Sequence, residues 1–355
     1  MDTSFFGIDG APVLNESEGI ARGAWRYDAR GNPLEGFFFG LDGKPSLHKN
    51  GYARTTRRYD ERGNLVEVAY FGLDDKPTLT KDGVARVTWR YDARGNKVEE
   101  AYFGVDDRPM FSLYGLARVT WRYDEHGNQV EQAFFGVDGK PTLNRGGIAR
   151  WTAQYDERAN AVENAFFGPD GNPALIRDGF ARVTIRHDER GNIVEQAYFG
   201  VDGKPVLHKK DGNARATFGY DERGNRVEVA YFDAEGHSVM IDGIGAVARN
   251  AYDDYGRRIS RIYLDERGQI VPVEVEVKDV VTNGTAARIG LKPGDRLLSY
   301  DGEPLHSTDQ LIALTGRSDP GMKELTYRRG EATFSVQVPP GGLGVATVNV
   351  RAATP

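Results

Sequence analysis

A short motif recurs along most of this chain at a nearly constant spacing of about 32 residues. It reads approximately Gly-x-Ala-Arg, then Tyr-Asp-x-x-Gly-Asn, and then Tyr-Phe-Gly followed by Asp-Gly-x-Pro. The Phe-Gly step falls at Phe6, Phe39, Phe71, Phe103, Phe135, Phe167 and Phe199, with degenerate copies at Phe232 and Leu264. A fixed period of this size predicts one supersecondary unit stacked on copies of itself. Such arrays usually bind other molecules rather than catalyse reactions.

Each copy of the motif predicts a β-hairpin. In the copy that begins at Gly83, apolar and polar residues alternate from Ala85 to Asp92, which is the period of a half-buried strand. A turn follows, in which Gly95 can adopt a positive φ, and residues 97–103 then predict a second strand that ends in two aromatic residues. A lone hairpin is marginally stable in water, whereas hairpins in series can bury a continuous apolar face.

We therefore expect a mainly β fold, in which residues 1–268 form about eight antiparallel hairpins. The hairpins would build a long twisted sheet or an open β-superhelix, because sheets twist with one hand. A propeller is less favoured, since a blade needs about four strands and each copy supplies two with a third short piece. The chain enters the first copy at Met1 without a cap, which predicts either upstream residues or end-to-end association.

Three polar positions recur in the copies. They are Arg22, Arg54, Arg86, Arg118, Arg150, Arg182 and Arg215; Glu35, Glu67, Glu99, Glu131, Glu163, Glu195 and Glu228; and Asp28, Asp60, Asp92, Asp124, Asp156, Asp188, Asp221 and Asp253. One interpretation is a ladder of ligand sites. The other, which we favour, is a ladder of Arg–carboxylate pairs that fixes the register between hairpins, because residues that are identical in every copy normally serve the stack.

Contact residues are expected instead where the copies differ. One variable position reads Trp25, Arg57, Trp89, Trp121, Ala153, Ile185 and Phe218. If this face is exposed, Trp25, Trp89 and Trp121 form a contact surface for a partner or a glycan. The alternative, which we favour, is that the face packs as core.

The Tyr-Asp-x-x-Gly-Asn motif resembles the YD repeats of RHS-type bacterial proteins and the MORN-variant repeats. The resemblance extends over residues 4 to about 268, although the period and the Phe-Gly half of the motif differ from both. It implies a bacterial β-hairpin array and no specific activity.

After about residue 268 the period stops, and residues 269–355 carry a different pattern. Its signature is Gly284-Thr-Ala-Ala287, then Gly290-Leu-Lys-Pro-Gly-Asp295, and then Asp301-Gly302. This pattern, over about 270–350, resembles a PDZ domain of the bacterial type. The resemblance implies an α+β domain that binds a partner's C-terminus or internal strand by adding it to a sheet edge.

The resemblance also implies a loop that gathers backbone N–H groups around the peptide carboxylate. The nearest match is Gly342, Leu343, Gly344 and Val345, followed by a strand at 346–350, so the order of elements would be permuted. The alternative is a closing turn with a plain tail. The second wall of the peptide site would be a helix over 308–314, contributing Gln310, Leu311 and Leu314.

Several classes of site are absent from the sequence. The net charge is −6 with mixed signs, so no basic block favours nucleic acid, and no apolar run approaches the roughly 20 residues that span a bilayer. Cysteine is absent, and the six histidines do not have metal-binding spacing. Nucleophile-elbow and phosphate-loop motifs are missing as well. We expect no metal, no cofactor and no catalytic residues.

These observations favour a non-enzymatic scaffold in which the array displays a peptide-binding module. The alternatives are a substrate-recognition or regulatory fragment of a larger bacterial protease or signalling or defence system, an extracellular adhesin, and a target of proteolysis. No signal-peptide pattern begins at Met1. A cytoplasmic location follows if Met1 is the natural start, and a periplasmic or surface location is expected for a fragment.

Overall fold

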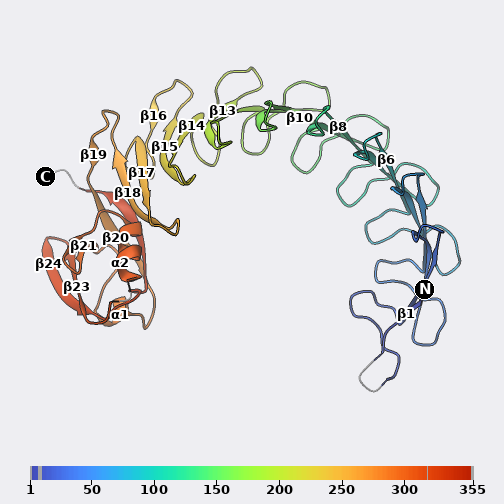
Figure 1. Cartoon of the computed structure of the whole chain (residues 1–355), viewed down its shortest axis with the longest axis horizontal. Helices are drawn as coiled ribbons and strands as arrows, with labels where there is room; N and C mark the ends of the chain where they lie inside the picture. The colour runs from blue at the N-terminus through green and yellow to red at the C-terminus, as the bar shows by residue number, and fades with distance from the viewer. Residues whose placement is uncertain (1, 7–9, 318, 353–355) are drawn as a thin grey trace. The chain divides into compact units, whose positions relative to one another are not determined.

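The computed structural model describes residues 2–6, 10–317 and 319–352. The chain divides into two compact units, which are described separately. The first comprises Met1–Val183 with Gly200–Gly203, and the second comprises Thr184–Phe199 with Lys204–Pro355. Figure 1 shows the hairpins in succession and, in the second unit, a C-terminal domain with two short helices.

The first unit is a series of antiparallel hairpins. Its strands are β1 (Asp2–Ser4), β2 (Arg22–Tyr27), β3 (Pro33–Phe39), β4 (Arg54–Tyr59), β5 (Leu65–Phe71), β6 (Arg86–Tyr91), β7 (Lys97–Phe103), β8 (Arg118–Tyr123), β9 (Gln129–Phe135), β10 (Arg150–Tyr155) and β11 (Ala161–Phe167). In the hairpin of β6 and β7, Arg86 pairs with Phe103, and the register shifts by a bulge beside Tyr91. Consecutive hairpins also pair, as Glu67 of β5 does with Thr88 of β6.

The second unit continues the series and ends in the C-terminal domain. Its array strands are β13 (Ile193–Phe199), β14 (Arg215–Tyr220), β15 (Arg226–Phe232), β16 (Ser238–Val239), β17 (Val247–Tyr252), β18 (Arg258–Leu264) and β19 (Ile270–Val271), and β12 (Arg182–His187) lies at the division of the two units. The prediction of a mainly β chain with tandem antiparallel hairpins is confirmed.

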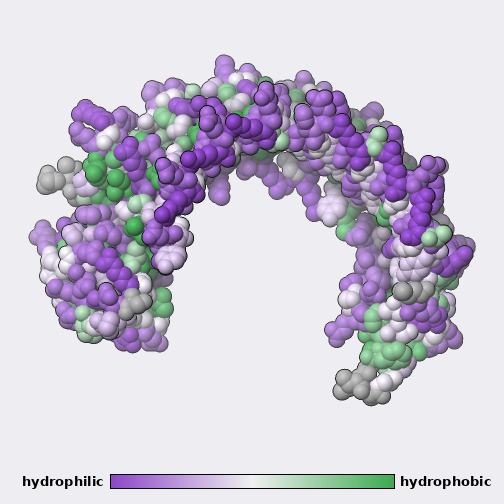
Figure 2. Space-filling model, in the orientation of Figure 1, coloured by the Kyte–Doolittle hydropathy of each residue, from purple (hydrophilic) through white to green (hydrophobic). Residues whose placement is uncertain are grey.

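The two faces of the hairpins differ because side chains alternate along a strand. One face packs under the segments that connect the hairpins: Val119 and Phe134 of the strands meet Leu116 and Ile148 of the connections in one buried cluster. The other face carries the recurring Arg, Glu and Phe side chains. Figure 2 shows hydrophilic side chains over much of the array surface that faces the viewer.

The recurring arginine and glutamate join each hairpin to its neighbour. The guanidinium of Arg86 lies over the ring of Phe103 in its own hairpin, 3.9 Å from the ring centre. The same group forms ion pairs with Glu67 of the preceding hairpin at 3.2 Å and with Asp107 at 2.5 Å. Equivalent Arg–Glu pairs join the other hairpins, so the structural interpretation of these two ladders holds.

The recurring aspartate organises the hairpin turn. Asp92 accepts hydrogen bonds from the backbone N–H groups of Arg94 and Asn96, both at 2.9 Å, and from the side-chain amide of Asn96 at 3.0 Å. The Asn96 amide is the main cause that holds the pKa of Asp92 below its ordinary value. Arg94 in turn donates to the carbonyl of Glu125 in the next turn. Asp92 therefore closes its own hairpin turn, and the contact with the next turn is made by Arg94.

The C-terminal domain is a separate sheet closed by two helices. Its elements are β20 (Val273–Val280), α1 (Thr285–Arg288), β21 (Arg296–Tyr300), β22 (Glu303–Pro304), α2 (Thr308–Thr315), β23 (Lys323–Arg329), β24 (Ala332–Val338) and β25 (Val345–Arg351). The strand order is β24-β23-β21-β20-β25, with β22 beside β21. Val275, Leu297 and Leu325 lie at its core, and the predicted α+β domain is confirmed.

An ion pair between a buried aspartate and a partly exposed arginine holds the turn before β21. Asp295 is 1% exposed and accepts two hydrogen bonds from Arg329, both at 2.7 Å. Burial by itself would raise the pKa of Asp295, but the hydrogen bonds and charge of Arg329, with the N–H of Lys292, hold it below its ordinary value. This pair fixes the Gly-Asp turn of the sequence signature.

Replacing the ladder arginine tests the role of the inter-hairpin contacts. Arg86→Ala should lower the free energy of unfolding by about 1–2 kcal/mol, because it removes a ring contact and two ion pairs. Arg90→Ala is the matched control: its side chain is 73% exposed and lies 3.8 Å from Glu99, so a change below about 0.5 kcal/mol is expected. Urea unfolding followed by circular dichroism measures both. Equal effects would contradict this role of Arg86.

Candidate functional site

The free edge of β25 is the candidate site. Among the described strands, β25 pairs only with β20, through contacts such as Thr347 with Val277 and Asn349 with Val275. An unpaired strand edge is a template for an added strand. The predicted strand at 346–350 therefore exists, and it lies at the edge of the sheet.

The loop before β25 is anchored so that its N–H groups face away from the domain. The carbonyl of Leu343 accepts a hydrogen bond from the N–H of Ala286 at 2.8 Å, and that of Gly344 accepts one from Val281 at 2.9 Å. Because C=O and N–H of one trans peptide point in opposite directions, the N–H groups of Gly344 and Val345 point outward.

No described residue accepts a hydrogen bond from the N–H of Gly342, Leu343 or Gly344. Gly344 has φ +71°, a conformation that favours glycine, and the side chain of Leu343 is 3% exposed in the domain core. The loop residues named by the sequence are thus brought together as a row of backbone donors. Such a row suits an anionic group, for example a carboxylate.

Helix α2 lies beside β25, and two of the three residues that the sequence suggested on it are buried. Leu311 and Leu314 are each 4% exposed and belong to the domain core. The side chain of Gln310 bonds to the N–H of His306 and the carbonyl of Pro304. The predicted wall thus combines the half-buried Gln310 with two buried leucines, and its contact with a peptide stays a prediction.

Another face of α2, adjacent to the side that packs on the core, is the better candidate for the wall of the peptide site. Thr308, Ile312 and Thr315 recur at the spacing of one helix face, and Ile312 is 63% exposed. Ser307 caps the helix by accepting from the N–H of Gln310 at 3.1 Å.

The last hairpin of the array contacts α2 and β25 directly, and Figure 1 shows β18 beside α2. Arg258 of β18 pairs with Asp309 at 3.0 Å. The N–H of Arg261 donates to Ser307 at 3.4 Å, and Tyr263 shares a hydrogen bond with Asn349 at 3.3 Å. The last hairpin is therefore packed against the C-terminal domain.

A cavity of about 930 Å³ lies between α2 and this hairpin. Its apolar lining includes Ile259, Ile262, Ile270, Val273 and Ile312. Figure 2 shows hydrophobic side chains gathered in the region of β19 and the start of β20. The arginines of its rim are paired with carboxylates, such as Arg317 with Glu303 at 2.5 Å, so their charge is largely neutralised.

The variable tryptophans of the array are half-buried. Trp25 packs edge-on against Phe38 at 5.8 Å, and a side chain on Gly36 would collide with its ring. Trp121 packs against the buried cluster of its hairpin, and Lys97 lies over its ring at 4.5 Å. Trp89 is also half-buried, opposite Glu100. Their contact role remains a prediction.

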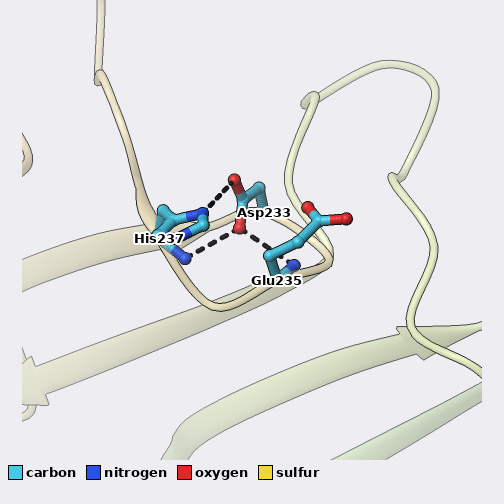
Figure 3. A group of neighbouring side chains, drawn as sticks. All are labelled: Asp233, Glu235 and His237. Atoms are coloured by element: carbon cyan, nitrogen blue, oxygen red, sulfur yellow. Dashed lines mark hydrogen bonds and ion pairs between the residues drawn. The ribbon is translucent and has the colours of Figure 1, made fainter.

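Asp233, Glu235 and His237 are the one group in the described residues that could hold a metal ion (Figure 3). Asp233 already accepts hydrogen bonds from the N–H of Glu235 at 3.0 Å and of His237 at 2.7 Å, and its other oxygen lies 3.2 Å from the imidazole. This is the turn bonding of Asp92 in a degenerate copy. The turn accounts for the group.

Neither α1 nor α2 has the length and apolar character needed to cross a membrane, and no other helix occurs in the described part of the chain.

A family model of the PDZ domain matches residues 276–329, so the C-terminal domain is a PDZ domain. The solved PDZ domain of the SdrC-like protein of Listeria monocytogenes is similar, with 20% identity and TM-score 0.19, over 21% of this chain and 86% of that one. No curated protein sequence matches the chain.

Two larger solved structures are also similar. One is the Tc holotoxin pore of Photorhabdus luminescens, with 13% identity and TM-score 0.38, over 93% of this chain and 15% of that one. The other is a TcdB2–TccC3 protein, with 13% identity and TM-score 0.33, over 87% of this chain and 12% of that one. This chain thus spans a small fraction of their length.

The contact between Tyr263 and the C-terminal domain predicts a dependence on alkaline pH. Burial raises the pKa of Tyr263 to about 12 from its ordinary 10.0. The fold favours the neutral phenol, so its contribution to stability is complete below pH 10 and is lost as pH rises towards 12. Tyr263→Phe should therefore flatten the fall of stability over this range.

The control for this titration is Tyr255→Phe, because Tyr255 is 86% exposed. Thermal unfolding midpoints at a series of pH values between about 9 and 12 measure the slope for each variant. An unchanged slope in Tyr263→Phe would show that its phenol ionises as freely in the folded chain as in the unfolded one.

Proposed function

We propose that the PDZ domain binds the free C-terminus of a partner protein along β25. The peptide would add as an antiparallel strand to the open edge of β25, with its carboxylate at the N–H groups of Gly342–Val345. Ile312 of α2 would contact an apolar side chain near the peptide end. The protein would act as a non-catalytic interaction module.

The orientation of the loop peptides carries this proposal. The carbonyls of Leu343 and Gly344 are held by α1 and by the end of β20, which leaves the N–H groups of Gly344 and Val345 directed outward at the start of an edge strand. Hydrogen bonds from N–H groups to a carboxylate are charge-assisted and stronger than neutral ones.

The hairpin array would serve as the scaffold that displays the domain. Its polar positions are occupied by contacts between hairpins, as for Arg86 with Glu67, and this leaves the variable positions for a second partner. Holding two partners on one chain raises their effective concentration for each other. The half-buried Trp89 and Trp121 remain the candidates for that second contact.

The test uses the full chain and a library of fluorescein-labelled decapeptides of random sequence with a free carboxylate. The tightest binder should bind at least about tenfold more weakly as its C-terminal amide, because the amide loses the charge that the loop recognises. Fluorescence anisotropy measures both forms. Equal binding of the acid and the amide would refute carboxylate recognition.

Ile312→Asp locates the site on the domain. It should weaken binding of the selected peptide at least about tenfold, because a charge replaces an apolar contact beside β25. Met322→Asp is the matched control, since Met322 is 57% exposed and precedes β23, away from β25 in the sheet. Binding that is equally sensitive to both variants would place the peptide elsewhere.

A further inference from the structure

Asn349 joins β25 to two other elements of the second unit. Its Oδ1 accepts a hydrogen bond from the backbone N–H of Thr308, the first residue of α2, at 2.7 Å. Its Nδ2 donates to the hydroxyl of Tyr263 in β18 at 3.3 Å. The side chain therefore crosses from the edge strand to the start of the helix and to the last hairpin of the array.

The groups that hold Asn349 are themselves fixed. Tyr263 is 1% exposed, and its hydroxyl donates to Asp242 at 2.6 Å. Thr308 follows the helix cap Ser307, which is 0% exposed and also accepts from the N–H of Arg261. The hydroxyl of Thr308 is inaccessible to solvent. The end of β25 beside the start of α2 is therefore closed.

The backbone of β25 sets how far an added strand could pair before this point. The N–H of Val345 points away from β20, and because strand residues alternate, Thr347 and Asn349 offer their backbone groups on the same free edge. In an antiparallel pair of strands, these alternate residues of β25 would exchange hydrogen bonds with every second residue of the added peptide. A peptide that ends at the loop thus meets Val345 and Thr347 first, and then Asn349.

We infer that Asn349, held by Thr308 and by Tyr263 of the last hairpin, limits the ligand to a short C-terminal tail of about four residues. Residues further from the ligand's end must leave the strand edge and turn into solvent. This inference rests on the proposed binding along β25. It makes Asn349 a specificity-determining residue that also contacts a hairpin of the array.

The experiment compares peptide lengths on the full chain. The tightest free-acid decapeptide of the random library and its own C-terminal tetrapeptide are titrated by competition in fluorescence anisotropy. For the wild-type chain the two dissociation constants should agree within about threefold, because residues beyond the fourth form no strand pairs. For Asn349→Ala the decapeptide should bind at least about fivefold more tightly than before, with the tetrapeptide unchanged.

Two further variants separate the effect from general damage. Asn349→Asp keeps the acceptor for Thr308 at a helix N-terminus and should retain the wild-type length pattern. Thr308→Pro removes the N–H donor, at the first helical position where proline is tolerated, and should behave as Asn349→Ala even if that variant fails to fold. Gln337→Ala, on the opposite edge strand β24, is the control and should bind both peptides as the wild type does.

Three results would overturn the inference. A wild-type decapeptide at least about tenfold tighter than its tetrapeptide would show that pairing continues past Asn349. A length pattern that is unchanged in both Asn349→Ala and Thr308→Pro would show that the bridge has no influence. A library without any binder would remove the proposed function and this inference with it, whereas binding that lacks the length pattern removes the inference alone.

Discussion

The contact between a ladder arginine and the preceding hairpin is the interaction on which the array depends. Each hairpin can form locally, because its turn is closed by the aspartate and its strands are short. What a hairpin cannot set alone is its register on the next one. Arg86 does so by lying over Phe103 of its own hairpin while it pairs with Glu67 of the one before. The ring keeps the guanidinium in place and shields it partly from water, which makes the ion pair more directional than an exposed one.

The sequence was sufficient for the array and for the class of the C-terminal domain, because both are encoded locally. The period repeats the same strand alternation and the same turn, so every copy supports the same prediction, and the Gly-Asp turn at Asp295 belongs to a dense signature. The phase of α2 was not predictable in the same way. An eight-residue helix offers few apolar positions, and only the tertiary structure shows that Leu311 and Leu314 face the core while Ile312 faces solvent.

The contacts at the end of β25 were also beyond the sequence, for a different reason. Asn349 and Tyr263 are separated by 86 positions, and each is unremarkable in its local pattern. Their meeting depends on how the last hairpin packs against α2, which no motif encodes. The boundary predicted at residue 268 separates two elements that share hydrogen bonds. The sequence allowed Gly342–Val345 to be proposed as the carboxylate-binding loop, because its glycines stand out. It did not reveal that the carbonyls of Leu343 and Gly344 bond to the body of the domain.

The packing of β18 against α2 gives the last repeat a neighbour that the other repeats lack. In a stack of similar units, an end without a cap opens first, since its outer face has lost half of its contacts. Here the PDZ domain covers that face at the C-terminal end of the array. A ligand that binds only the folded PDZ domain would also stabilise the terminal hairpins that pack against it, by part of its binding free energy. Local unfolding of the array would then begin at hairpins far from the PDZ domain. The occupied domain would suppress unfolding at the end to which it is attached.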